Sequence, residues 1–257
     1  MTENPGKLVD AHFHLDLCKD PAAVLSECEA LGIYTIAVTN APSVFAYTQR
    51  LAGPTKHVRA ALGLHPELVT SHSHELPDLL HLMEQTRYIG EIGLDYVTSD
   101  GAVRQQQKTV FETILRRAAD FGDRILTIHS RRAATDVIAC VGTAFPGTAI
   151  LHWFSGSRRE LHVGLQAGCY FSVNSAMIKS EKGKALIREI PRDRLLTETD
   201  GPFIEVDRRP ALPSDVRQTI EGIANLWNVD PAEAASTVLS NFRTVIESRL
   251  AHDKPAE

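Results

Sequence analysis

Short apolar segments rich in β-branched residues alternate with longer amphipathic segments along this chain, and a glycine, a proline or a polar break follows each pair. Such alternation is typical of repeated strand–helix units. Eight strand-like segments span residues 8–13, 34–39, 58–64, 88–94, 125–129, 149–154, 169–173 and 195–199. Eight units in 257 residues predict an α/β fold of the (β/α)8 TIM-barrel type. An open, doubly wound sheet is the alternative, because the pattern does not distinguish a closed sheet from an open one.

Helix-like segments follow the strands. They include residues 21–31, 103–121, 133–141 and 158–167, and two further helices at 214–227 and 231–250 close the chain. Three of the segments are followed by Gly32, Gly122 or Gly168, and glycine is common just beyond a helix because it adopts positive φ without strain. The proline- and arginine-rich stretch 202–213 is predicted to be a long loop over one end of the barrel.

Composition indicates one domain with a large core. The chain is 43% hydrophobic, and no linker or change of composition divides it, so we predict a single domain over residues 1–257. No uncharged apolar run approaches the roughly 18 to 20 residues that cross a bilayer, and the first seven residues lack the apolar core of a signal peptide. We therefore expect a cytoplasmic protein without a membrane partner. Its four cysteines are scattered, which indicates neither a disulfide framework nor a zinc module.

The charge pattern argues against a protein that coats nucleic acid non-specifically, but it does not exclude a local basic site. Lysine and arginine total 27 against 32 acidic residues, a net charge of −5. Nine of the 27 follow strands directly and are expected on one rim: Arg131, Arg132, Arg158, Arg159, Lys179, Lys182, Lys184, Arg208 and Arg209. Of these, we predict that Arg131, Arg158 and Arg208 bind the substrate. The aromatic residues Tyr96, Trp153 and Phe154 are candidates for stacking on a base.

Ionisable residues stand at the carboxyl ends of the strands, where a buried sheet would otherwise be apolar. His12 and His14 end the first strand, and both point to the same side because strand side chains alternate. Later strands end at His65, Glu91, His129, His152 and Asp200. Imidazoles and carboxylates without thiolates suit zinc, manganese, iron or magnesium-like ions, and a carboxylate among four histidines can bridge two of them.

The same His-x-His spacing recurs at His72 and His74, but in a polar stretch with no strand. We interpret this second pair as part of a solvated loop. Context rather than spacing therefore separates the two pairs.

Six ordered motifs carry a resemblance that covers essentially the whole chain. They are residues 10–16 (DAHFHLD), 63–66 (GLHP), 90–96 (GEIGLDY), 128–131 (IHSR), 152–156 (HWFSG) and 198–202 (ETDGP). In order and spacing they resemble the TatD family of metal-dependent deoxyribonucleases, within the amidohydrolase superfamily. The chain departs from the family's pattern at residues 205–214, where relatives carry an Arg/Lys-rich loop ending in Asn-Glu-Pro. This shortened form resembles relatives in multi-gene anti-phage islands, which implies a multi-protein defence complex as a partner.

The resemblance implies a TIM barrel of the metal-dependent hydrolase type with two divalent ions, Mg, Mn or Zn. It places His12, His14 and Asp200 around one ion and His129 and His152 around the other. Glu91 would bridge the two, and His65 would lie beside the substrate phosphate. We expect Asp200, Glu91 and His65 to be the catalytic residues, with Asp200 also the general base for the attacking water. Glu198 and Asp95 are expected to orient the ligands.

These expectations favour a hydrolase that acts on DNA, as an exonuclease on single strands or 3′ ends, because a threaded strand reaches a barrel mouth more easily than a duplex. Two other functions stay open. One is an amidohydrolase or deacylase on a small amide, an ester or an aminoacyl-RNA, since the same activated water attacks a carbonyl. The other is a non-catalytic scaffold, which the full ligand set disfavours.

Overall fold

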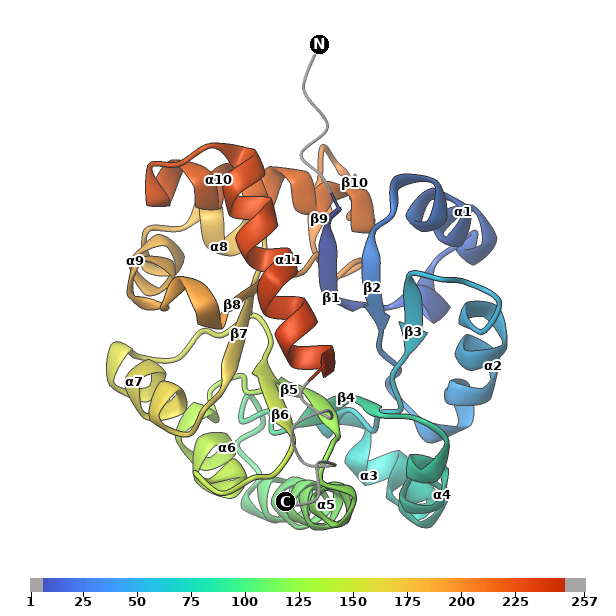
Figure 1. Cartoon of the computed structure of the whole chain (residues 1–257). Coiled ribbons are helices and arrows are strands. Elements are labelled where there is room, and N and C mark those ends of the chain that lie inside the picture. The colour runs from blue at the N-terminus through green and yellow to red at the C-terminus, as the bar shows by residue number, and fades with distance from the viewer. Residues whose placement is uncertain (1–6, 248–257) are drawn as a thin grey trace, which may run out of the picture.

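A computed structural model describes residues 7–247 and contains all eight predicted strands, so the predicted barrel is confirmed (Figure 1). The domain limits predicted at residues 1 and 257, and the last three residues of the helix predicted to end at 250, lie outside the described part. The strands are β1 (Val9–Phe13), β2 (Tyr34–Ala37), β3 (Val58–Ala60), β4 (Tyr88–Gly93), β5 (Ile125–His129), β6 (Thr148–Leu151), β7 (Tyr170–Val173) and β8 (Leu195–Thr197).

Backbone hydrogen bonds close the sheet, which decides against the open alternative. Parallel pairing runs from β1 to β3 and from β4 to β8. An isolated parallel bridge between Leu62 and Ile89 joins the two runs after β3. On the other side, Asp200 N donates to His12 O and His14 N donates to Gly201 O, both at 2.9 Å, which links the chain after β8 to the end of β1. Closure therefore brings the first and the eighth strand ends together.

Helices surround the barrel in chain order, as the colour sequence of Figure 1 shows. Helix α1 keeps its predicted bounds because Asp20 accepts a hydrogen bond from Ala23 N, and Gly32 ends the helix at φ +68°. The set comprises α1 (Pro21–Leu31), α2 (Pro42–Ala52), α3 (Val69–His72), α4 (Leu76–Leu82), α5 (Gly101–Phe121), α6 (Ala134–Val141), α7 (Arg158–Gln166), α8 (Ser175–Lys179), α9 (Glu181–Glu189), α10 (Val216–Trp227) and α11 (Pro231–Glu247).

The last helix seals the amino-terminal end of the barrel. Asn241 on α11 donates to Leu195 O at the start of β8, and the Phe242 ring lies 5.8 Å from that of Tyr34 at the start of β2. Arg87, just before β4, donates to Ile246 O of the same helix. With this end covered, the carboxyl ends of the strands form the mouth. Across residues 7–247, no helix combines the length and apolar character needed to span a membrane.

Two segments predicted as loops contain regular secondary structure. Residues 202–213 contain a hairpin of β9 (Glu205–Val206) and β10 (Arg209–Pro210), whose turn residues Asp207 and Arg208 both have positive φ. Arg209 binds Asp215 through two hydrogen bonds of 2.7 and 2.8 Å, which anchor the hairpin. The His72 and His74 pair lies in α3 and the 3₁₀ turn Ser73–Glu75 rather than in a loop, because the turns continue towards α4.

Candidate metal centre

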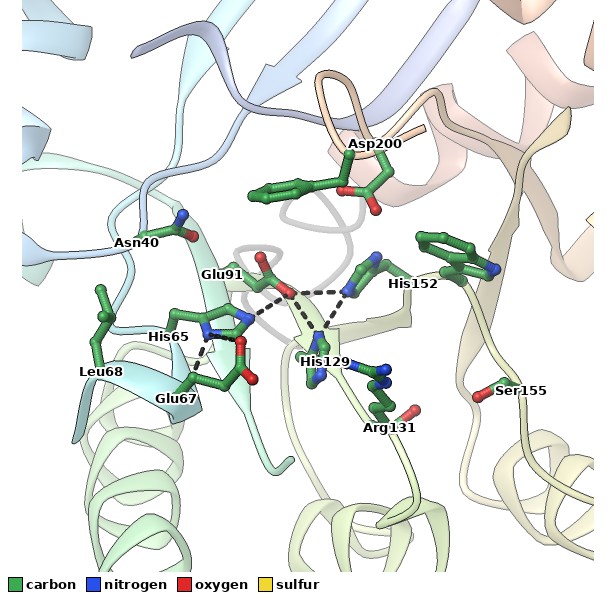
Figure 2. A pocket seen from close by; sticks show the side chains of 13 residues that line it. Asn40, His65, Glu67, Leu68, Glu91, His129, Arg131, His152, Ser155 and Asp200 are labelled. Carbon is green, nitrogen blue, oxygen red and sulfur yellow. Dashed lines mark hydrogen bonds and ion pairs between the residues drawn. The ribbon is translucent and has the colours of Figure 1, made fainter. Parts of the chain in front are cut away.

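The strand-end residues predicted from the sequence meet at one pocket of about 550 Å³ at the mouth of the barrel (Figure 2). Its lining includes His65, Glu91, His129, His152 and Asp200. His12 and His14 are fully buried and contact Glu91 and Asp200 from below the pocket surface. Six different strands therefore supply one cluster of seven ionisable side chains.

Glu91 lies at the centre of the cluster, and its two oxygens face different imidazoles. Oε1 lies 2.8 Å from His129 Nδ1 and 2.9 Å from His152 Nε2, and Figure 2 shows these rings pointing at it. Oε2 lies 3.4 Å from Nε2 of both His12 and His14. A carboxylate placed in this way can coordinate one cation through each oxygen.

Asp200 completes the His12 and His14 side of the cluster. Its Oδ1 lies 3.6 Å from His12 Nε2 and 3.5 Å from His14 Nε2. The residue adopts φ +50°, a conformation that aspartate tolerates better than most residues. Thr199, the residue before Asp200, is bound to Asp10 on β1. The Asp10 carboxylate accepts hydrogen bonds from the backbone N–H and the hydroxyl of Thr199. The buried pair of Asp10 and Thr199 thus fixes the position of Asp200.

Asp95 and Glu198, which we expect to orient ligands, each contact an imidazole of the cluster. Asp95 Oδ2 accepts from His129 Nε2 at 2.8 Å, which directs the other ring nitrogen towards Glu91. Glu198 Oε1 accepts from Trp153 N at 3.0 Å and lies 3.8 Å from His152 Nδ1. Sequence reasoning missed Thr127, whose hydroxyl lies 2.6 Å from His12 Nδ1, because a threonine inside a strand carries no signal of its own.

A hydrogen bond to the His65 ring sets its tautomer. Glu67 N donates to His65 Nδ1 at 3.2 Å, so the neutral ring carries its proton on Nε2. That nitrogen lies 3.3 Å from Glu91 Oε1. A protonated nitrogen cannot bind a cation, so this arrangement favours a hydrogen-bonding role for His65 rather than coordination.

The electrostatics of the cluster fit a cation. Burial raises the pKa of Glu91, but the nearby imidazoles of His65 and His152 outweigh it and hold that pKa well below its usual range. Burial lowers the pKa of His14, whereas Asp200 and Glu91 raise it to about 9. The neighbouring carboxylates also raise the pKa values of His129 and His152 against the effect of burial, whereas burial lowers that of His12. Without an ion, protons on His14, His129 and His152 therefore balance the carboxylates, and a bound cation would take their place.

Three overlapping groups have ligand atoms close enough to hold an ion, and all their members come from the predicted set. Within each group the atoms lie within 4.8 Å of one another. His129 shows the fit most directly: Asp95 accepts from its Nε2, so its Nδ1 faces Glu91 Oε1 at 2.8 Å, and a cation there would replace the proton that this contact otherwise shares. The groups are His12, His14 and Asp200; His12, Glu91 and His152; and His65, Glu91 and His129, of which the last would need the other tautomer of His65.

The predicted basic residues do not all reach the pocket. Arg131 lines it, whereas Arg158 lies 2.6 Å from Glu189 of α9 in an ion pair. Arg208 stands at the turn of the hairpin and is not among the lining residues. The structure thus brings one of the three predicted substrate-binding arginines to the candidate site.

The aromatic residues around the pocket also differ from expectation. Phe154 is buried and packs against Phe171, so it cannot stack on a base, and Tyr96 donates to Asp136 away from the pocket lining. Trp153 lines the pocket as expected. Phe203 lines it too and was missed, because nothing in the sequence around a proline-rich loop indicates where a single phenylalanine points.

Comparison with known proteins places this arrangement in a family. A family model described as TatD related DNase matches residues 9–247. A metal-dependent hydrolase of Escherichia coli K12 called YcfH, itself uncharacterised, is 29% identical over 91% of this chain and 94% of its own length. The 3′-5′ ssDNA/RNA exonuclease TatD of Citrobacter rodentium is 29% identical over 87% of this chain and 90% of its own. The crystal structure of YjjV, a TatD homologue of E. coli K12, superposes with a TM-score of 0.84 at 26% identity and covers 93% of this chain and 97% of the other.

Proposed function

Because the chain belongs to the TatD family of metal-dependent hydrolases, we propose that its reaction is hydrolysis of DNA phosphodiester bonds, from single strands or 3′ ends. The observation that carries the proposal is Glu91, whose two oxygens face separate sets of imidazoles at the floor of the pocket. That geometry suits two divalent ions, and paired ions stabilise the attacking and leaving oxygens of a displacement at phosphorus. The name of the Citrobacter relative agrees with this substrate class.

The ions would be held by His12, His14 and Asp200 on one side and by His129 and His152 on the other, with Glu91 shared. Bound divalent ions supply Lewis acidity, which lowers the pKa of water and offsets charge on a phosphoryl oxygen. Asp200 uses Oδ1 towards the histidines, so Oδ2 is free to take a proton from the attacking water and return it to the leaving oxygen. His65 Nε2–H donates to a phosphate oxygen that enters beside Glu91.

A substrate panel after metal removal tests the proposal. The chelated protein should have no phosphodiesterase activity on labelled single-stranded DNA, and Mg, Mn or Zn should restore it. Duplex DNA and an aminoacyl ester, assayed with the same ions, separate the alternatives. Activity on the ester but not on DNA would replace the proposal by the deacylase function, and full DNA cleavage in excess chelator would refute the metal centre. Membership of a multi-protein defence complex stays a prediction.

Arg131 gives a prediction about substrate binding. Arg131→Gln should raise KM for an oligonucleotide roughly fivefold with a smaller change in kcat, because an exposed charge contributes about 1 kcal/mol and binds ground and transition states alike. The slope of log KM against log salt should fall by about 0.7. Arg158→Gln should have a smaller effect, since Arg158 already pairs with Glu189. Exposed Arg243 on α11, at the sealed end, provides the control Arg243→Gln, and equal effects of all three variants would contradict a local site.

A further inference from the structure

The apolar side chain of Phe203 is exposed to water, which is energetically unfavourable for an aromatic ring. Within residues 7–247, six large hydrophobic side chains are exposed, and Phe203 is the most exposed of them at 59%. Of these six it is the one that lines the pocket. An exposed aromatic ring beside a cluster of polar residues indicates a ligand with a flat apolar face.

The backbone around Phe203 is well anchored. Phe203 N donates to Asp200 O at 2.9 Å, so the residue follows directly from the candidate centre. The chain beyond it forms the β9–β10 hairpin, in which Ile204, Val206 and Ala211 make a small buried cluster against Trp153. The ring of Phe203 is thus presented to the pocket by a fixed support.

The ring also has a face available. Its centroid lies 5.0 Å from that of His14, and the two rings are perpendicular at 89°. In such a contact an edge meets a face, so His14 covers at most one face of Phe203. The ring therefore offers a flat surface within a few ångströms of the proposed reacting atoms.

We propose that Phe203 stacks on the base of the nucleotide whose phosphate is cleaved. The proposal rests on the proposed function. It adds that the enzyme recognises an unpaired base of the substrate, whichever of the four bases this is. Every base has a π face, so a stacking platform tolerates all four bases. A base inside a duplex has both faces covered by its neighbours, so this contact favours single strands. A pocket of about 550 Å³ is within the range of sites that enclose one small ligand.

Kinetics on two matched oligonucleotides test the proposal. One is an ordinary single strand, and the other has abasic residues at its 3′ end. Phe203→Ala should raise KM for the ordinary strand about 5- to 160-fold, with kcat within about threefold, whereas Phe203→Tyr should stay near wild type. On the abasic strand, wild type and Phe203→Ala should agree within about twofold. Exposed Val163 on α7 supplies the control Val163→Ala.

A binding measurement gives a second readout that does not need turnover. The fluorescence of 2-aminopurine at the 3′ end should be quenched on binding wild type and Phe203→Tyr, and not on binding Phe203→Ala. An unchanged KM and unchanged quenching in Phe203→Ala would overturn the proposal. Equal losses on the ordinary and the abasic strand would also overturn it, because Phe203 would then act only by supporting His14. If wild type cleaves neither strand, the proposed function fails first, and stacking on DNA fails with it.

Discussion

Glu91→Gln is expected to abolish hydrolysis, with a loss in kcat of at least about 10³-fold. Glutamine keeps the shape of the side chain but replaces one oxygen by an NH₂ group, which would point its protons at the imidazoles around Oε1 or Oε2. The change removes the negative charge shared by both halves of the centre. Divalent ions contribute several kcal/mol of charge stabilisation to the transition state, and each 1.36 kcal/mol is tenfold in rate.

Metal content and rate, measured on the same preparation, check this prediction. Elemental analysis should show fewer ions per chain in Glu91→Gln than in wild type after equal loading. Glu221 is exposed on α10, so Glu221→Gln is a matched control that should keep both metal and rate. A Glu91→Gln protein with wild-type metal content and wild-type rate would rule out a shared carboxylate. Circular dichroism confirms that any loss occurs in a folded protein.

The place of Glu91 in the cluster could be predicted from the sequence because the geometry of a barrel determines where the strand ends lie. Parallel strands in a closed barrel end on the same rim, so ionisable residues at strand ends must converge whatever their separation in the chain. His12 and His14 meet Asp200 in this way across almost 190 residues. His72 and His74 have the same spacing but lie in helical turns, and they join none of the three candidate ligand groups within residues 7–247.

Features that depend on individual side-chain contacts outside the strands could not be predicted. Nothing in the sequence pairs Arg158 with Glu189, 31 residues away on another helix, so the sequence alone predicts that its charge binds the substrate. The hairpin after β8 depends on two residues with positive φ and on the bond between Arg209 and Asp215, none of which gives a periodic pattern. Phe203, which lines the pocket, lies just before this hairpin. Candidate substrate contacts are therefore less predictable than the candidate metal centre, because loops rather than strands supply them.

Asp200→Asn separates the two roles assigned to Asp200. Asparagine accepts positive φ as readily as aspartate, so the backbone at φ +50° should be kept, and one oxygen can still face His12 and His14. The amide has almost no basicity, so proton transfer from the attacking water should fail. General base catalysis supplies about 10²- to 10⁴-fold, and we expect kcat to fall by at least that factor while the oligonucleotide still binds.

Asp207 offers a close control for this substitution, because it also has positive φ and lies exposed at the turn of the hairpin. Asp207→Asn should keep wild-type kcat, which would show that an amide at such a backbone position is harmless. Single-turnover rate, oligonucleotide binding and metal content are then compared for both variants. If excess divalent ion restores the full rate to Asp200→Asn, Asp200 acts only as a ligand, and the base is Glu198 or a water held at the centre. A wild-type rate without added ion would refute both roles, because neither coordination nor proton transfer would then need the carboxylate.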